Sequence, residues 1–123
     1  MAKSVVAFSL EEFDPSYTRV IIDDVSFYDS VITDLGTLEV ITGYADFRES
    51  KVTDLGNLTT ILGNADFSNS EVENLENLTT IGGYADFEGS KIKDLGNLTK
   101  IGGTIIFGDR TDLEAEWEKR KNK

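Results

Sequence analysis

Residues 71–90 read EVENLENLTTIGGYADFEGS, and this 20-residue unit decides the fold of the chain. The neighbouring blocks align with it without insertions: VITDLGTLEVITGYADFRES at 31–50, KVTDLGNLTTILGNADFSNS at 51–70 and KIKDLGNLTKIGGTIIFGDR at 91–110. A degenerate copy that ends in IIDDVSFYDS occupies residues 11–30. A fixed period of this length is typical of a solenoid, in which each repeat packs against its neighbours.

The repeats predict one solenoid domain over residues 1–123. We expect a mainly β stack of about six rungs with parallel strands, closed by a cap at each end. Residues 1–30 are assigned to an N-terminal capping turn and the degenerate repeat, and 31–110 to four repeats. Residues 111–123 are assigned to a capping α-helix.

Apolar residues recur at fixed positions of the repeat, so equivalent side chains should stack along the solenoid axis. In the pattern x-Ala-Asp-Phe-x, the alternation of a strand places Ala and Phe inside and Asp outside. Each copy therefore predicts a short strand that pairs in parallel with the next copy, about 4.8 Å away. The inward phenylalanines should form a spine of five rings: Phe27, Phe47, Phe67, Phe87 and Phe107.

The N-terminal segment departs from the repeat. The stretch SVVAF at 4–8 lies one period before DVSFY at 24–28, which predicts a first strand stacked on that segment. The sequence SLEE at 9–12 has the capping-box pattern and predicts a helical turn at 10–14. A terminal element of this kind is expected, because the first rung has no neighbour on one side.

The C-terminal segment has the pattern of an amphipathic helix over residues 112–121. Thr111 and Glu114 form a second capping box, and Leu113 lies four residues before Trp117 on the same helical face. We expect this face to seal the last rung. A helix that binds a partner protein is the alternative.

Composition limits the chemistry that the chain can perform. It has 123 residues, a net charge of -11 from 12 basic and 23 acidic residues, and neither Cys nor His. Disulfides, Cys/His zinc sites and imidazole-dependent catalytic triads are therefore excluded. An acidic body repels nucleic acid and anionic membranes, so we expect no direct contact with either and a basic or neutral protein partner.

Targeting signals are not apparent in the sequence. The N-terminal residues MAKSVVAFSLEEF do not have the pattern of a signal peptide. No stretch approaches the roughly 20 apolar residues of a membrane-spanning helix. We therefore expect a cytoplasmic protein.

The strand segment resembles that of the leucine-rich repeat, which runs LxxLxLxxNxL. In GGYADFEGSKI at 82–92, Ala85 and Phe87 match the two strand leucines, Ser90 the asparagine and Ile92 the closing leucine. The stretch NLTTIGGYADF is also similar to the NLxxIxG signature of receptor L domains. This resemblance implies a curved horseshoe or a straighter, right-handed β-helix-like stack. It also implies binding of macromolecules, usually proteins, through the strand face, and no catalysis.

Asp46, Asp66 and Asp86 stack at the outward strand position of three successive repeats. No basic residue shares their column, whereas another column alternates in sign as cross-strand neighbours prefer, with Lys51, Glu71 and Lys91. Like charges about 5 Å apart in water cost on the order of 1 kcal/mol per pair. Retention of this cost at three repeats suggests a function.

The functional hypothesis is a face that recognises a basic protein surface, since Tyr provides rigid contact area and Asp charge-assisted hydrogen bonds. The candidate residues are Tyr28, Tyr44, Asp46, Arg48, Asn64, Asp66, Tyr84, Asp86 and Glu88. One alternative is a solvated acidic ladder that only keeps the sheet face soluble. Another is a divalent cation that bridges two rungs.

Two further polar columns have a structural interpretation. The N-x-T triplets have the form of glycosylation sites, but they recur with the repeat and are interpreted as turn residues. These triplets begin at Asn57, Asn77 and Asn97. A second column is interpreted as turn or helix caps; it comprises Asp34, Asp54, Asn74 and Asp94.

We therefore expect a protein–protein interaction module without metal or cofactor. We expect no enzymatic activity and no catalytic residues, because a ladder of equivalent acids has no environment that separates their pKa values. The alternative function is an acidic decoy that mimics nucleic acid and occupies a DNA- or RNA-binding protein, as small phage-encoded inhibitors can do. A third possibility is self-association through the solenoid ends, with Val6, Phe8 and Tyr28 as contacts.

Overall fold

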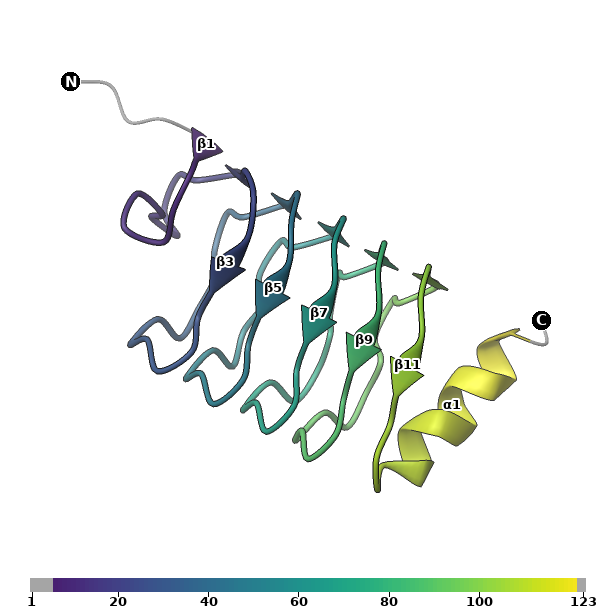
Figure 1. Ribbon diagram of the computed structural model, residues 1–123. Helices are drawn as coiled ribbons and strands as arrows, with labels where there is room; N and C mark the ends of the chain where they lie inside the picture. The colour runs from purple at the N-terminus through teal and green to yellow at the C-terminus, as the bar shows by residue number, and fades with distance from the viewer. Residues whose placement is uncertain (1–5, 122–123) are drawn as a thin grey trace.

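The computed structural model describes residues 6–121 and shows a parallel β-solenoid that ends in one α-helix (Figure 1). Six strands form the first sheet: β1 (Val6–Ala7), β2 (Val20–Ile21), β4 (Val40–Ile41), β6 (Thr60–Ile61), β8 (Thr80–Ile81) and β10 (Lys100–Ile101). Five strands form the second: β3 (Val25–Ser26), β5 (Ala45–Asp46), β7 (Ala65–Asp66), β9 (Ala85–Asp86) and β11 (Ile105–Ile106). The helix, α1, spans Thr111–Lys121.

From β2 onward, each strand pairs with the equivalent strand of the next repeat. In the second sheet Ala45 lies opposite Ala65, and Asp46 opposite Asp66. In the first sheet Ile41 lies opposite Ile61. The predicted parallel stack is therefore confirmed, and equivalent residues lie over one another along the axis.

Each turn contains two strands where the pattern predicted one. The first sheet is built from two-residue strands whose inward residue is the repeated Ile, and the chain bends at Gly43 and its equivalents before the second sheet begins. A Cβ at Gly43 would lie 2.6 Å from the backbone carbon of Asp23, so the close stacking of turns requires glycine there. Strands this short leave no alternation for the sequence pattern to detect.

The core is a set of continuous columns between the two sheets and the connecting segments. The leucines at 35, 38 and their equivalents in the three following repeats are fully buried, as are Ile41 and Phe47. The predicted phenylalanine spine is confirmed: successive ring centroids are 5.1, 4.8, 5.9 and 6.0 Å apart in stacked arrangements. Stacked pairs of this kind add about 0.5–1.5 kcal/mol each beyond the area they bury.

The predicted position of the first strand is wrong. β1 pairs with β2 through Val6 opposite Val20 and Ala7 opposite Ile21, so it extends the first sheet instead of stacking on residues 24–28. The two paired strands are therefore closer in sequence than one full repeat. Phe13 takes over the end of the spine, with its ring edge-on to Phe27 at 6.1 Å. Residues 4 and 5 of the predicted strand lie outside the described residues.

The predicted helical turn at 10–14 is present but shorter than expected, because two successive i→i+3 hydrogen bonds wind only residues 10–12. Residues 10–12 form a hydrogen-bonded turn, in which the N–H of Glu12 donates to the carbonyl of Ser9 at 3.2 Å, and no helix follows. The Glu12 carboxylate accepts from the N–H of Phe8 at 3.0 Å, one residue earlier than in a capping box. The turn therefore ends before Phe13, whose ring packs against Phe27.

The C-terminal helix is confirmed, although residues 122 and 123 of the assigned segment lie outside the described residues. Leu113 is 1% exposed and Trp117 is 7% exposed, and both belong to the core cluster. The apolar face of α1 therefore covers the last turn, as the spacing of these two residues predicted.

Side chains of α1 replace the backbone of a following turn. Between inner turns, the N–H of Asn57 donates to the carbonyl of Gly36 at 3.1 Å. In the last turn, the equivalent carbonyl of Gly96 accepts from Arg120 Nη1 at 2.8 Å, and the same nitrogen donates to Leu98 O at 2.9 Å. The guanidinium thus satisfies carbonyls that the ends of a solenoid leave unpaired.

Two more residues complete this cap. Arg110 Nη1 donates to the carbonyl of Ser90 at 2.6 Å, and its Nη2 donates to the carbonyl of Ile92. Glu116 Oε2 accepts from the N–H of Leu95 at 3.4 Å and pairs with Arg120 at 2.7 Å. The cap is therefore polar as well as apolar.

We predict that Arg120→Ala lowers the free energy of unfolding by about 2 kcal/mol, because two backbone carbonyls lose a charged donor. Chemical denaturation measures the change. The matched control is Lys119→Ala, since Lys119 is exposed on the same helix and should change stability by no more than about 0.5 kcal/mol. Equal effects of the two substitutions would show that α1 caps through its apolar face alone.

One turn has a glutamate where the equivalent turns of the other repeats have glycine. The turn that follows Asp34 and its equivalents adopts a left-handed backbone, with φ of 57° at Gly36, 56° at Gly56 and 59° at Gly96. Glu76 occupies the same position with φ of 52°, a conformation that costs a side-chain-bearing residue about 1–2 kcal/mol. Burial, together with the nearby charge of Asp54, raises the pKa of the Glu76 carboxyl.

We predict that Glu76→Gly stabilises the chain by about 1 kcal/mol through relief of backbone strain. A raised pKa means that the folded state holds this proton more tightly than the unfolded chain does. The wild type should therefore lose stability as pH rises from the ordinary value of 4.5 through the raised pKa, and the variant should not. Urea denaturation on both sides of this window checks the prediction; a variant less stable than wild type at every pH would contradict it.

Candidate functional site

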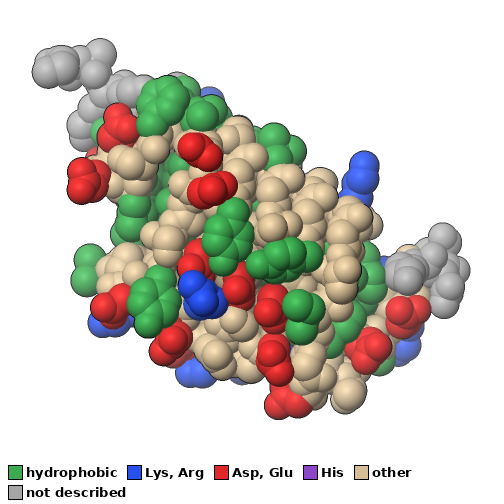
Figure 2. Space-filling model, viewed as in Figure 1, with side chains coloured by type: hydrophobic (Ala, Val, Ile, Leu, Met, Phe, Trp, Pro, Cys, Tyr) green, Lys and Arg blue, Asp and Glu red, His purple; other side chains and the backbone are tan. Residues whose placement is uncertain are grey.

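The outward side of the second sheet carries three columns of side chains, called here the strand face. All nine candidate residues lie in these columns, which the pairing register aligns across the turns. Figure 2 shows apolar and acidic side chains mixed on this side of the molecule, with a basic side chain near the centre of the view. The columns are Tyr44, Asn64 and Tyr84; Ser26, Asp46, Asp66 and Asp86; and Tyr28, Arg48, Ser68 and Glu88.

The aspartate column is not the solvated ladder that one alternative assumed. Asp46 is 3% exposed and Asp66 is 8% exposed, while Asp86 is partly exposed. The three residues do stack in register, as predicted. Because buried carboxylates need hydrogen-bond partners, their contacts explain why they are tolerated.

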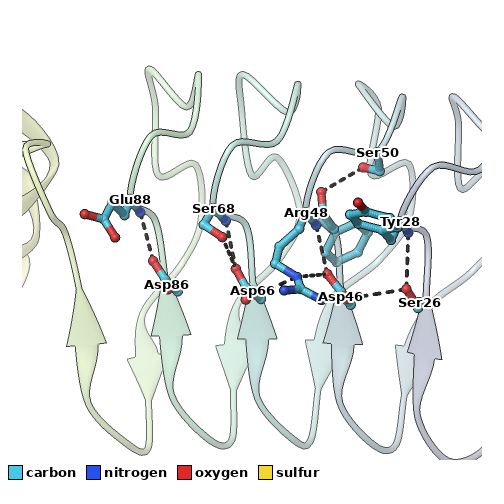
Figure 3. Close-up of polar contacts among 10 residues, drawn as sticks. Ser26, Tyr28, Asp46, Arg48, Ser50, Asp66, Ser68, Asp86 and Glu88 are labelled. Atoms are coloured by element: carbon cyan, nitrogen blue, oxygen red, sulfur yellow. Dashed lines mark hydrogen bonds and ion pairs between the residues drawn. The ribbon is translucent and has the colours of Figure 1, made fainter.

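Each of these aspartates closes a turn at the end of its strand. The Oδ1 atom accepts a hydrogen bond from the backbone N–H two residues later (Figure 3). These N–H groups belong to Arg48 (2.9 Å), Ser68 (2.9 Å) and Glu88 (3.0 Å). Asp side chains commonly form such turns, so the repeat of Asp has a structural cause.

Arg48 supplies the positive charge that the column lacks. Its Nε donates to Asp46 Oδ1 at 3.0 Å and its Nη2 to Asp46 Oδ2 at 2.8 Å, a bidentate pair (Figure 3). Its Nε also lies 3.8 Å from Asp66 Oδ2. The prediction that the column is uncompensated is therefore wrong, because the compensating cation lies in the same repeat as Asp46, just beyond its strand, and not in the aspartate column.

Arg48 also contacts Tyr28. The guanidinium carbon lies 5.7 Å from the centroid of the Tyr28 ring, within the range of a cation–π contact. Tyr28 is 52% exposed and the Arg48 side chain is 49% exposed. The two side chains thus form an ordered and partly exposed projection above the buried Asp46.

The ionisation states of this cluster follow from its contacts. Burial acts to raise the pKa of the Asp46 carboxyl, but hydrogen bonds from the side chain and backbone of Arg48 outweigh it and lower the pKa. The pKa of Arg48 is raised by the same pair. Burial first, then the charges of Asp46 and Asp66, raise the pKa of Tyr44 to about 12, so its hydroxyl remains a hydrogen-bond donor at neutral pH.

Both buried aspartates act as hydrogen-bond acceptors in this arrangement. Asp46 is held ionised, and the Oδ1 of Asp66 accepts from both the N–H and, at 2.6 Å, the hydroxyl of Ser68. A general acid at neutral pH needs a raised pKa. Within residues 6–121, no group of three or more acidic side chains is placed to hold a metal ion.

The other polar columns have structural roles. The column of Asp34 and its equivalents closes turns in the same way as the aspartates above. For example, the N–H of Gly36 donates to Asp34 Oδ1 at 2.7 Å. In the N-x-T triplets, each Thr hydroxyl donates to a backbone carbonyl of the preceding turn at 3.1–3.3 Å. The Asn side chains are exposed, and Asn77 donates to Gly56 O at 3.1 Å. The triplets thus form hydrogen bonds that join neighbouring turns.

No family model matches the sequence, and the searches of curated proteins and of solved structures found no match either. The geometry itself identifies a repeat solenoid of parallel strands in which each turn corresponds to one sequence repeat. In the described part of the chain, no helix combines the length and apolar character needed to cross a membrane.

We predict that Asp46→Asn costs about 2 kcal/mol of stability at neutral pH, because charge-assisted hydrogen bonds are lost at a buried position. Since the folded pKa of Asp46 is lowered, its contribution is present above the ordinary value of 3.8 and is lost as pH falls through the folded pKa. The difference between wild type and variant should therefore shrink in acid.

The matched control is Asp86→Asn, which removes a carboxylate with the same turn bond but with no arginine beside it. We expect it to cost less than about 1 kcal/mol. Denaturation of both variants across an acidic pH series checks the pair. Equal costs at Asp46 and Asp86, or a difference that persists in acid, would contradict the role given to Arg48.

Proposed function

We propose that the chain is a protein-binding solenoid that contacts its partner through the strand face, centred on Tyr28, Tyr44, Arg48 and Tyr84. The observation that carries the proposal is the arrangement of Arg48, which Asp46 holds by two hydrogen bonds while about half of its side chain stays accessible. Tyr and Arg dominate the energetics of protein interfaces. A side chain fixed before binding loses less conformational freedom in the complex.

The two remaining tyrosines extend this surface. Tyr44 and Tyr84 are partly exposed and lie in one column, separated by Asn64, whose side-chain oxygen accepts from the N–H of Tyr84 at 3.0 Å. Their rings offer amphipathic contact area with only two side-chain torsions to restrict. The hydroxyl of Tyr44 adds a donor whose protonation does not change near neutral pH.

Charge favours a partner with a basic surface. Asp86 is partly exposed, Glu88 is exposed, and the chain as a whole carries -11. Asp46 and Asp66 are buried and contribute to the electrostatic field instead of direct contacts. Such a field steers a basic partner and raises its association rate. The resemblance to leucine-rich repeats supports the same surface, because those solenoids bind proteins through their strand face.

The test compares capture of partner proteins from host lysate by wild type and by the Tyr44→Ala/Tyr84→Ala double variant, which leaves the net charge unchanged. We expect the affinity for the partner to fall by about tenfold or more. The control is Leu62→Ala, which removes a 54% exposed apolar side chain outside the strand face and should not weaken capture.

Equal capture by wild type and the double variant would contradict the proposal. If, in addition, the captured proteins bind nucleic acid and capture falls steeply with salt, the acidic-decoy function would replace it.

A further inference from the structure

At the C-terminal end of the stack, the outer edges of the two sheets are not capped in the way that the rest of the last turn is. Among the described residues, β10 pairs only with β8 and β11 only with β9. The hydrogen bonds from α1 and from Arg110 reach the backbone of the last turn between residues 90 and 98, before either strand begins. Figure 1 shows α1 beyond β11 at the end of the stack. The cap thus satisfies one part of the last turn and leaves the strands as edges.

The register shows which backbone groups β11 presents at this end. In the preceding turn, the N–H of Ala85 donates to Thr104 O at 3.0 Å and that of Phe87 donates to Ile106 O at 2.7 Å. The equivalent residues one repeat later are Ile105 and Phe107. Their N–H groups therefore point beyond the last turn, and no hydrogen bond from either is found within residues 6–121.

The side chains at this end are also uncovered. Ile105 and Phe107 are partly exposed, whereas their equivalents Ala85 and Phe87 are at most 1% exposed. Ile106 is 40% exposed at the position that holds Asp in the three preceding turns. Natural proteins protect edge strands with charge or proline, and the stretch TIIFG at 104–108 has neither.

We propose that β11 binds an extended segment of another protein, which adds a strand to the second sheet beside α1. Such a segment supplies backbone carbonyls at strand spacing to the N–H groups of Ile105 and Phe107. Apolar side chains at its alternate positions cover those two residues. The segment is recognised by its extended backbone and apolar alternation, not by charge.

A second copy of this chain does not fit the same edge. Stacking a whole turn would need the backbone of the last turn between residues 90 and 98, and side chains of Arg110 and α1 already occupy the carbonyls there, including Gly96 and Leu98. A single strand needs none of these carbonyls. The site is distinct from the strand face, so it does not depend on the function proposed above.

The probe is the peptide ITGYADFRES, residues 41–50, because this segment already contains a strand that pairs within the second sheet. We expect millimolar peptide to slow amide hydrogen exchange of Ile105 and Phe107 in the full chain. The amides of Ala85 and Phe87, which are bonded in the free protein, serve as the internal reference. No added protection at Ile105 and Phe107 would overturn the proposal.

Two substitutions at one position test the backbone contact. Ile105→Pro removes an outward N–H that β9 does not use, and proline is tolerated at such edge positions. Ile105→Ala keeps that N–H and restores the residue of the three preceding turns. We expect the proline variant to bind the peptide about tenfold more weakly than the alanine variant. Equal binding by folded variants would overturn the proposal.

A chemical variant of the probe keeps the test independent of protein folding. Methylation of alternate peptide nitrogens blocks strand pairing on one edge of the peptide only, so one of the two methylation patterns should abolish protection and the other should preserve it. Loss with neither pattern would overturn the proposal. A free chain that forms dimers with Ile105 and Phe107 already protected would assign the edge to a second copy, which also overturns it.

Discussion

Parallel backbone pairing between equivalent positions of successive repeats is the interaction on which the whole structure depends. It places each phenylalanine over the next and each outward aspartate over the next, so every column of the surface inherits its geometry from this register. Stability in such a stack is a sum of contacts between neighbouring turns. The ends are therefore the positions where the register lacks a partner, and α1 supplies one for part of the last turn through arginine and glutamate side chains.

The repeat made most of this architecture predictable, because columns and period are properties of the sequence itself. The spine of phenylalanines and the capping helix follow from spacing alone. The position of the first strand did not follow from the repeat. β1 pairs with Val20 and Ile21, at a sequence spacing shorter than the repeat period. The second strand of each turn was missed because two residues carry no detectable alternation.

The sequence pattern placed the nine candidate residues on one face of the sheet, but it did not predict the electrostatics of that face. The column pattern of the sequence captures contacts between turns and misses contacts within a turn. Arg48 neutralises Asp46 from within the same turn, and its backbone N–H completes the carboxylate's hydrogen bonds. The aspartate column, which the sequence pattern presents as exposed charge, is thus a row of turn-forming residues. The accessible part of the face consists of tyrosines, the fixed arginine and the acids at one end.

Equivalent positions of neighbouring repeats lie directly over one another inside the stack, and the whole architecture follows from this alignment. The most direct measurement is a nuclear Overhauser experiment on a chain whose phenylalanine rings alone carry protons. We expect contacts between the rings of Phe47 and Phe67, whose centroids lie 4.8 Å apart, and between each successive pair along the spine. Contacts that skip a turn, or the absence of contacts between neighbouring rings, would contradict this alignment.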